Sequence, residues 1–329
     1  MSLAAPTIEA FFTERLMRQK NASPHTVASY RDCLKLLLSY VHKTRGVAPS
    51  KLDFGDLDAA TIGAFLDFLE RDRGVSVQSR NVRLAAIRSL FVFASLRHPE
   101  HAALIGRVLA IPSKGGERTL VSFLLPAEVD ALLGSPDRSR RVGRRDHALL
   151  VLGVQTGLRV AELIGLCIED VHLGTGAFVH CVGKGRKERT TPLTKTTVAV
   201  LKPYLVERGG AGSDAVFPGP GGQPLGRDAI RRLVERHAAT AAWVCPSLAT
   251  KKTSPHTLRH TCAMRLLESG TDIATIGLWL GHASSRTTEV YLHAHLALKE
   301  RAIARTVPPG TVPDRYHPPD KLLVFLEGL

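Results

Sequence analysis

Six residues in the second half of the chain have side chains suited to chemistry on a phosphate group. They are Arg159, Lys184, His256, Arg259, His282 and Tyr291. A guanidinium stays charged and can bind two phosphate oxygens at once, and an imidazole can donate hydrogen bonds or move a proton. A phenol is a poor nucleophile until cationic neighbours or a base help to remove its proton, because its ordinary pKa is about 10. Together these groups are what a metal-free phosphoryl transfer onto a tyrosine would require.

Each of the six belongs to a short local motif. The motifs are Thr156-Gly157-Leu158-Arg159, Gly183-Lys184-Gly185, Pro255-His256-Thr257-Leu258-Arg259-His260 and Leu280-Gly281-His282, with Tyr291 nine positions further on. Taken singly, each has an ordinary structural explanation. A charged side chain is usually exposed, Gly-Lys-Gly suits a hairpin turn, and Leu-Gly-His suits a helix end capped by glycine. Their joint occurrence in this order favours a functional site.

In order and spacing, these motifs resemble those of the tyrosine recombinase, or phage integrase, family. That family includes Xer-like recombinases and the integrases of mobile elements. The resemblance runs from about Thr7 to about Thr306. It implies that Tyr291 attacks DNA to leave a 3′-phosphotyrosyl link and a free 5′-hydroxyl. No metal ion or nucleotide cofactor is implied.

The resemblance also implies roles for the other positions. Arg159 and Arg259 would stabilise the extra negative charge on the five-coordinate phosphorus, and the two histidines would donate further hydrogen bonds or shuttle a proton. Lys184 would act as the general acid that protonates the leaving 5′-oxygen. Glu162, three residues after Arg159, would help to hold the site together.

The first hundred residues predict a bundle of four helices. Their expected ranges are 6–20, 23–46, 59–73 and 76–93. The second helix begins at Ser23-Pro24, an N-cap followed by a proline at the first helical position, and the third stops at Gly74. The family resemblance implies that this part, residues 1–105, is a SAM-like core-binding domain that contacts DNA.

The rest of the chain predicts a linker, a mixed domain and a tail. Residues 106–123 have linker composition, residues 124–307 form the expected α+β catalytic domain, and residues 308–329 are a proline-rich tail. Helices are expected at 126–133, 145–154, 160–166, 194–207, 227–241, 255–269, 272–280 and 285–293, and strands at 177–181 and 189–193. Lys184 would lie in the turn between the strands. The predicted fold class is mainly α with a small antiparallel β-sheet.

Composition indicates a folded protein with a polyanionic partner. Lys and Arg total 44 against 30 Asp and Glu, a net charge of +14, and nucleic acid is the commonest partner of a folded basic protein. Five scattered cysteines show no C-x-x-C pair, which predicts reduced thiols rather than disulfides or zinc. No secretion signal or membrane span is evident, so we expect a cytoplasmic, nucleoid-associated protein that contacts no membrane.

Two groups of basic residues are candidate DNA contacts. They are Arg80, Arg83 and Arg88 on the fourth predicted helix, and Arg186, Lys187 and Arg189 next to Lys184. Helices of any basic protein have a charged face, so the first group could equally face water. The second group is more plausibly directed at phosphates because it flanks the expected general acid.

The sequence thus predicts a site-specific recombinase or integrase acting on double-stranded DNA sites, for integration, excision or transposition of a mobile element. The resemblance implies a homo-tetramer on paired sites, with an accessory recombinase or directionality factor as a possible partner. The segment after Tyr291 would pack either into a neighbouring subunit or onto its own domain. The stretch 237–253 is longer than in compact chromosome-dimer-resolving members, which favours a mobile-element role.

Other readings remain open from the residues alone. A catalytically silent DNA-binding accessory protein could share the fold, although all six positions are intact. A type IB topoisomerase-like enzyme shares the chemistry, but its usual pattern lacks the histidine at His256. His256 and His260 stand four apart and could share a metal, yet no suitable glutamate or cysteine pair is nearby. Tyr316 is a weaker candidate nucleophile because its surroundings are rich in proline.

Overall fold

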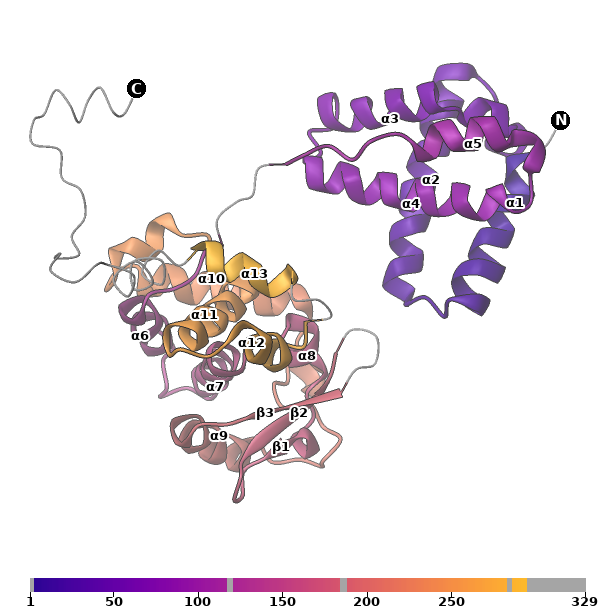
Figure 1. Cartoon of the computed structure of the whole chain (residues 1–329). Helices are drawn as coiled ribbons and strands as arrows, with labels where there is room; N and C mark the ends of the chain where they lie inside the picture. Colours follow the sequence, from indigo (N-terminus) through magenta and orange to yellow (C-terminus); the bar gives the residue numbers. More distant parts are fainter. Residues whose placement is uncertain (1–2, 117–120, 184–187, 283–285, 295–329) are drawn as a thin grey trace, which may run out of the picture. The chain divides into compact units, whose positions relative to one another are not determined.

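The chain folds into two compact units, residues 1–118 and residues 119–329 (Figure 1). The computed structural model describes residues 3–116, 121–183, 188–282 and 286–294. Within this part of the chain the structure is mostly helical with one three-stranded antiparallel sheet, which confirms the predicted fold class. Among the described residues, no helix is both long and apolar enough to cross a membrane.

The first unit is a helical bundle. Its helices are α1 (Ala4–Ala10), which continues as a π-helix over Phe11–Gln19, α2 (Pro24–Arg45), α3 (Ala59–Arg71), α4 (Val77–Ser95) and α5 (Ala102–Leu109). Short polar residues set the helix starts: the Ser23, Asp58 and Ser76 side chains each accept a hydrogen bond from a backbone N–H in the first turn. Phe11 and Phe65 are fully buried in the core.

Helix α5 departs from the sequence-based expectation, which placed the start of the linker at residue 106. The helix continues to Leu109 and buries Ile105 and Val108 against the bundle. No side chain caps its N-terminus. Packing against α4 therefore stabilises this helix more than any local sequence signal does.

Two of the candidate DNA-contacting arginines on α4 instead contact the chain that follows α5. Arg80 is 5% exposed and donates to the Pro112 carbonyl at 3.1 Å. Arg88 donates to the Ile111 carbonyl and the Ser113 hydroxyl. Arg83 is partly exposed and donates to the Ser79 carbonyl on its own helix at 3.2 Å. The guanidiniums of Arg80 and Arg88 thus fasten the start of the linker to α4.

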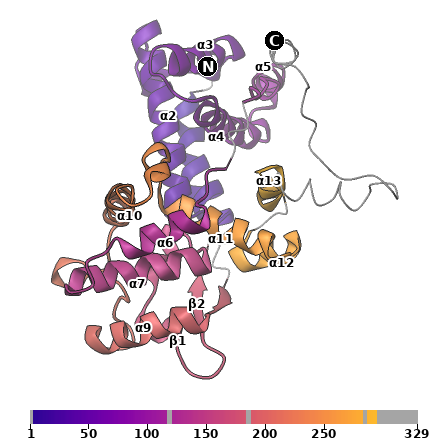
Figure 2. The same ribbon diagram turned by 90° about the vertical axis from the view of Figure 1, so that its left-hand side faces the viewer.

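The second unit surrounds helix α7 (Arg141–Thr156). The other helices are α6 (Pro126–Gly134), α8 (Val160–Gly165), α9 (Lys195–Arg208), α10 (Arg227–Ala241), α11 (Pro255–Glu268), α12 (Ile273–Leu280) and α13 (Arg286–Ala294). Helix α7 lies between α6 and α9, and the sheet lies beside α9 (Figure 2). Most of α7 is buried from Ala148 onward, so it forms the centre of the core.

The sheet has the strand order β1-β2-β3, with β1 (Val171–His172), β2 (Phe178–Val182) and β3 (Glu188–Pro192). Strands β2 and β3 agree with the two predicted strands to within a residue at each end, and Cys181 pairs with Arg189. The two-residue strand β1 was not predicted, because it is too short to show an alternating pattern. Lys184, Arg186 and Lys187 lie outside the described residues.

Gly157 ends α7 in a conformation that only glycine adopts easily. Its φ is +63°, and an added Cβ would lie 2.7 Å from Leu280 Cδ2 and 3.1 Å from Cys262 Sγ. A side chain here would therefore combine backbone strain with a clash against α11 and α12. The turn brings the end of α7 close to both helices.

We expect Gly157→Ala to destabilise the protein more than Gly176→Ala. Gly176 has a similar φ of +71° but open space around its Cα, so it isolates the backbone cost of about 1–2 kcal/mol. Gly157→Ala should add an overpacking cost of about 1–3 kcal/mol. Chemical denaturation of the two variants measures the difference. Equal losses would show that the contact with Leu280 and Cys262 relaxes without cost.

Candidate active site

Glu162, at the start of α8, connects two arginines. Its Oε2 accepts a hydrogen bond from the Arg159 backbone N–H at 2.7 Å, and its Oε1 accepts one from Arg159 Nη1 at 2.9 Å. Arg189 on β3 donates to the same two oxygens, at 2.9 Å from Nη1 and 2.8 Å from Nη2. Burial alone would raise the pKa of Glu162, but the hydrogen bonds from Arg189 and Arg159 outweigh burial and lower it. Glu162 is therefore a carboxylate at neutral pH.

Arg259 lies within the protein where three helix ends meet. It is 5% exposed and donates to the Gly157 carbonyl at 2.7 Å and to the Leu280 carbonyl at 2.6 Å. These bonds tie α11 to the C-terminal ends of α7 and α12. Burial, and then the charge of Arg159, lower its pKa to about 10. Arg259 thus stays protonated at neutral pH and supplies a buried positive charge.

Arg159 also contacts the end of α12. Its Nη2 donates to the Gly281 carbonyl at 2.8 Å, directly after the carbonyl that binds Arg259. The Arg159 side chain is 28% exposed, so part of its guanidinium faces solvent. Two guanidiniums on adjacent carbonyls, one of them accessible, form a positively charged site that suits a phosphodiester.

Tyr291 on α13 is held between two histidines. Its hydroxyl lies 3.0 Å from His260 Nδ1, and its ring stacks on that of His282 at an interplanar angle of 11°. The side chain is 1% exposed. Burial raises the pKa of Tyr291 to about 12, against the opposing influence of Arg259 and Arg159, whose charges favour the phenolate. The phenol is therefore protonated at neutral pH and needs help to become a nucleophile.

His282 is oriented by residues on both sides of it. Helix α12 ends at Gly281 with a φ of +63°, and the His282 N–H donates to the Gly277 carbonyl at 2.9 Å. His282 Nδ1 lies 2.7 Å from the hydroxyl of the fully buried Thr288. This contact leaves Nε2 available to another partner. Burial, with the charges of Arg259 and Arg159, lowers the pKa of His282 to about 4, so the ring is neutral at pH 7.

The structure brings most of the predicted residues together, with three additions. Arg159, Glu162, Arg259, His282 and Tyr291 are linked as described. His260 was not among the six predicted catalytic residues, yet it contacts the Tyr291 hydroxyl. Arg189 had been expected to contact phosphates, and Thr288 had not been singled out because a lone threonine carries no chemical signal.

His256 occupies a separate position at the start of α11. Its side chain is exposed, one turn before His260, in a helix whose N-cap is the Ser254 hydroxyl. Burial, and to a smaller extent the neighbouring His256, lower the pKa of His260 to about 4. Among the described residues, no group of three or more His, Cys, Asp or Glu side chains could hold a metal ion.

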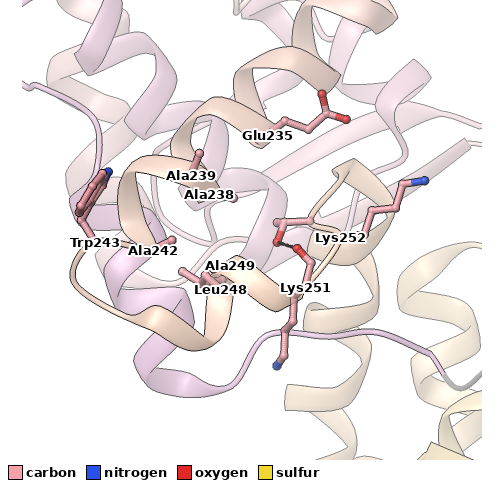
Figure 3. Close-up of a pocket in the computed structure, with 10 residues that line it drawn as sticks. Glu235, Ala238, Ala239, Ala242, Trp243, Leu248, Ala249, Lys251 and Lys252 are labelled. Atoms are coloured by element: carbon pink, nitrogen blue, oxygen red, sulfur yellow. Dashed lines mark hydrogen bonds between the residues drawn. The ribbon is translucent and has the colours of Figure 1, made fainter.

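A hollow of about 620 Å³ lies on α10 and the segment after it. Figure 3 shows alanines of α10 opposite Leu248 and Ala249, with Trp243, which is 88% exposed, at one side. None of the six predicted catalytic residues lines this hollow. The segment is anchored because buried Glu128 accepts hydrogen bonds from Lys251 Nζ and the Ser247 hydroxyl, each at 2.6 Å.

The neutral histidines make stability depend on pH. His260 and His282 both have a folded-state pKa of about 4, below the ordinary value of 6.5. Between these values the unfolded chain binds protons that the folded protein does not, so stability is complete above pH 6.5 and falls as the pH drops toward 4. The lowered pKa of Glu162 adds stability that is lost as the pH falls below the ordinary carboxyl value of 4.5.

We therefore expect the midpoint of thermal unfolding to fall between pH 7 and pH 5, and to fall less for His282→Asn. Asparagine cannot titrate in this range, so it removes the contribution of His282. The exposed His172 provides the control variant His172→Asn. Parallel melting curves for wild type and His282→Asn across this range would contradict the assignment of a neutral, buried His282.

Comparison with known proteins places this chain in a family. Residues 122–297 match the Phage integrase family, and residues 9–98 match the Phage integrase, N-terminal SAM-like domain. The chain is 50% identical over 325 residues to "Putative integrase/recombinase y4rC" of Sinorhizobium fredii, covering 99% of this chain and 98% of the relative. It is 35% identical to "Tyrosine recombinase XerC" of Pelobacter propionicus, covering 87% of this chain and 90% of that protein.

Solved structures agree with these sequence matches. The XerH site-specific recombinase bound to palindromic difH substrate, in a post-cleavage complex, matches with a TM-score of 0.70 and 26% identity, covering 87% of this chain and 81% of that one. The Tn1549 transposon integrase in complex with a circular intermediate DNA shares the fold, with a TM-score of 0.71 at 16% identity over 93% of this chain and all of that one. The chain belongs to the phage integrase family of tyrosine recombinases and is a DNA strand-exchange enzyme.

Proposed function

We propose that this recombinase breaks and rejoins DNA at specific sites through a covalent 3′-phosphotyrosine on Tyr291. The contact between the Tyr291 hydroxyl and His260, within the charged region of Arg259 and Arg159, supports the proposal most strongly. Tyr291 Oη would attack the phosphorus and form the Oη–P bond as the P–O5′ bond breaks. His260 Nδ1 would take the phenolic proton. Rejoining would reverse these steps, so the bond energy is retained and no cofactor is required.

The remaining predicted residues complete this chemistry. Arg159 and Arg259 would bind the non-bridging oxygens, where charge accumulates in the transition state. His282 would donate from Nε2 as a neutral ring, because its Nδ1 is occupied by Thr288. His256, exposed at the start of α11, would reach the phosphate from outside. Lys184 would protonate the leaving 5′-oxygen.

The biological setting of the proposal rests on the relatives. The XerH structure contains a DNA substrate and the Tn1549 integrase contains a circular intermediate DNA, so we infer double-stranded recombination sites as the partner of this chain. Half identity to an integrase/recombinase supports integration, excision or transposition of a mobile element. We infer a homo-tetramer on paired sites in the nucleoid, with an accessory recombinase or directionality factor as a further partner.

A trapping assay tests the covalent step. The full chain is incubated, in the presence of a metal chelator, with nicked duplexes that tile the DNA around its own gene. The nick lets a short fragment diffuse away after cleavage, so the covalent intermediate accumulates. We expect a complex that survives denaturing electrophoresis and yields a Tyr291 peptide carrying nucleotide. Specific DNA binding without any such complex would favour the catalytically silent accessory protein.

A further inference from the structure

Arg189 makes a two-pronged ion pair inside the protein. Its side chain is 10% exposed and that of Glu162 is 2% exposed. Each carboxylate oxygen of Glu162 accepts a hydrogen bond from one terminal nitrogen of Arg189, at 2.9 Å and 2.8 Å. A planar guanidinium fixes a carboxylate in this way better than any other side chain, because the two parallel bonds set the orientation as well as the distance. The orientation of Glu162 is therefore set from β3.

Glu162 passes this orientation on to Arg159. One carboxylate alone beside Arg159 would cancel its charge and hold its guanidinium away from a phosphate. With Arg189 as a second cation, the group of three keeps a net charge of +1, and only one side-chain nitrogen of Arg159 is bonded to Glu162. The partly exposed remainder of the guanidinium stays available to an anion. The second arginine thus balances the carboxylate that aligns the first.

Arg189 also approaches the turn that precedes His282. A Cβ added at Gly281 would lie 2.6 Å from Arg189 Nη1, so the Leu-Gly-His motif passes directly over this guanidinium. Burial and the charges of three arginines, Arg189 among them, lower the pKa of His282. A single side chain on β3 therefore adjoins two of the predicted catalytic motifs.

We propose that Arg189 is a positioning residue for strand cleavage, which acts by orienting Glu162 and through it Arg159 rather than by binding DNA. This inference rests on the proposed function, because it concerns the rate of the same cleavage step. It gives Arg189 a role different from the DNA contact that the sequence analysis predicted for it together with residues 186 and 187. Its effect should appear in the rate of cleavage and not in the affinity for DNA.

The test compares single-turnover cleavage of the nicked substrate, at saturating DNA, for Arg189→Gln, Arg189→Lys, Glu162→Gln and the Arg189→Gln/Glu162→Gln double variant. We expect Arg189→Gln to lower the rate by about a hundredfold, as misplacement of a catalytic group does. Lysine restores the charge without the two-pronged geometry, so it should recover only part of the rate. The double variant should be little slower than the single ones, because the two residues act as one unit.

The chain offers a matched control for loss of an ion pair. Arg144 and Glu207 form a two-pronged pair between α7 and α9, with both distances 2.7 Å. Arg144→Gln should cleave at the wild-type rate at a temperature where all variants remain folded. Equal slowing in Arg144→Gln would mean that general stability, and not positioning, limits the rate.

The outcomes separate this inference from the proposed function. If wild type forms no covalent complex with any duplex, the proposed function fails and this inference fails with it. If wild type cleaves and Arg189→Gln cleaves equally fast, only the role of Arg189 is refuted. A slow rate in Arg189→Gln that rises to the wild-type value at DNA concentrations above those that saturate wild type would also refute it, because Arg189 would then be a phosphate contact.

Discussion

Tyr291→Phe should abolish the covalent protein–DNA complex while leaving specific DNA binding intact. The substitution removes a single oxygen, and that oxygen is the only atom of the side chain able to form a bond to phosphorus. The ring should keep its place because it is 1% exposed and belongs to a buried hydrophobic cluster that includes Cys262, Met264 and Leu267 of α11. Loss of the hydroxyl leaves His260 Nδ1 without this partner, a cost of about 1–3 kcal/mol in stability. Denaturing electrophoresis after incubation with nicked DNA measures the complex.

Tyr204→Phe provides the control for this prediction. Tyr204 is also buried in the second unit, and its hydroxyl donates to the Val216 carbonyl at 2.7 Å. Removing that hydroxyl should lower stability by a similar amount and leave cleavage unchanged. Tyr316, outside the described residues, is the alternative nucleophile that the sequence offered. A complex that persists in Tyr291→Phe and disappears in Tyr316→Phe would transfer the role to that residue.

Features of the site that depend on a short stretch of sequence could be predicted. Gly281 ends a helix with a positive φ, as the motif Leu280-Gly281-His282 indicated, and the structure shows that Gly157 ends α7 in the same way. Ser and Asp N-caps fixed the helix starts in the same way. These features depend on residues a few positions apart, so the sequence contains the information needed to predict them.

Several contacts in the site and in the first unit could not be predicted, because nothing local to each residue identifies its partner. Arg189 meets Glu162 from 27 residues away, and basic neighbours made it resemble a DNA contact. Arg80 meets Pro112 across 32 residues, so its role in fastening the linker was equally hidden. Thr288 is six residues from His282, yet nothing in an isolated threonine marks it as a partner. Packing of separate elements determines each of these contacts.

After Tyr291, Arg259 is the residue whose loss we expect to have the largest combined effect on the cleavage rate and on stability. Of the positively charged residues that lower the pKa of Tyr291, the buried Arg259 has the largest effect. It also bridges the Gly157 and Leu280 carbonyls, which leaves little freedom in its position. A fixed charge of this kind needs no rearrangement as negative charge develops on the phosphate and on the leaving oxygen.

We expect Arg259→Lys to slow single-turnover cleavage by about 10²–10³-fold, the usual cost of one transition-state donor. The ammonium keeps the charge but cannot bond both carbonyls and a phosphate together, so geometry rather than charge is what the substitution removes. A carbonyl left without its donor should also cost about 1–3 kcal/mol of stability, visible in thermal unfolding. Arg265→Lys, on the exposed side of the same helix, should change neither quantity. If Arg259→Lys cleaved at the wild-type rate but melted early, the guanidinium of Arg259 would tie α7, α11 and α12 together without making a contact that the cleavage step requires.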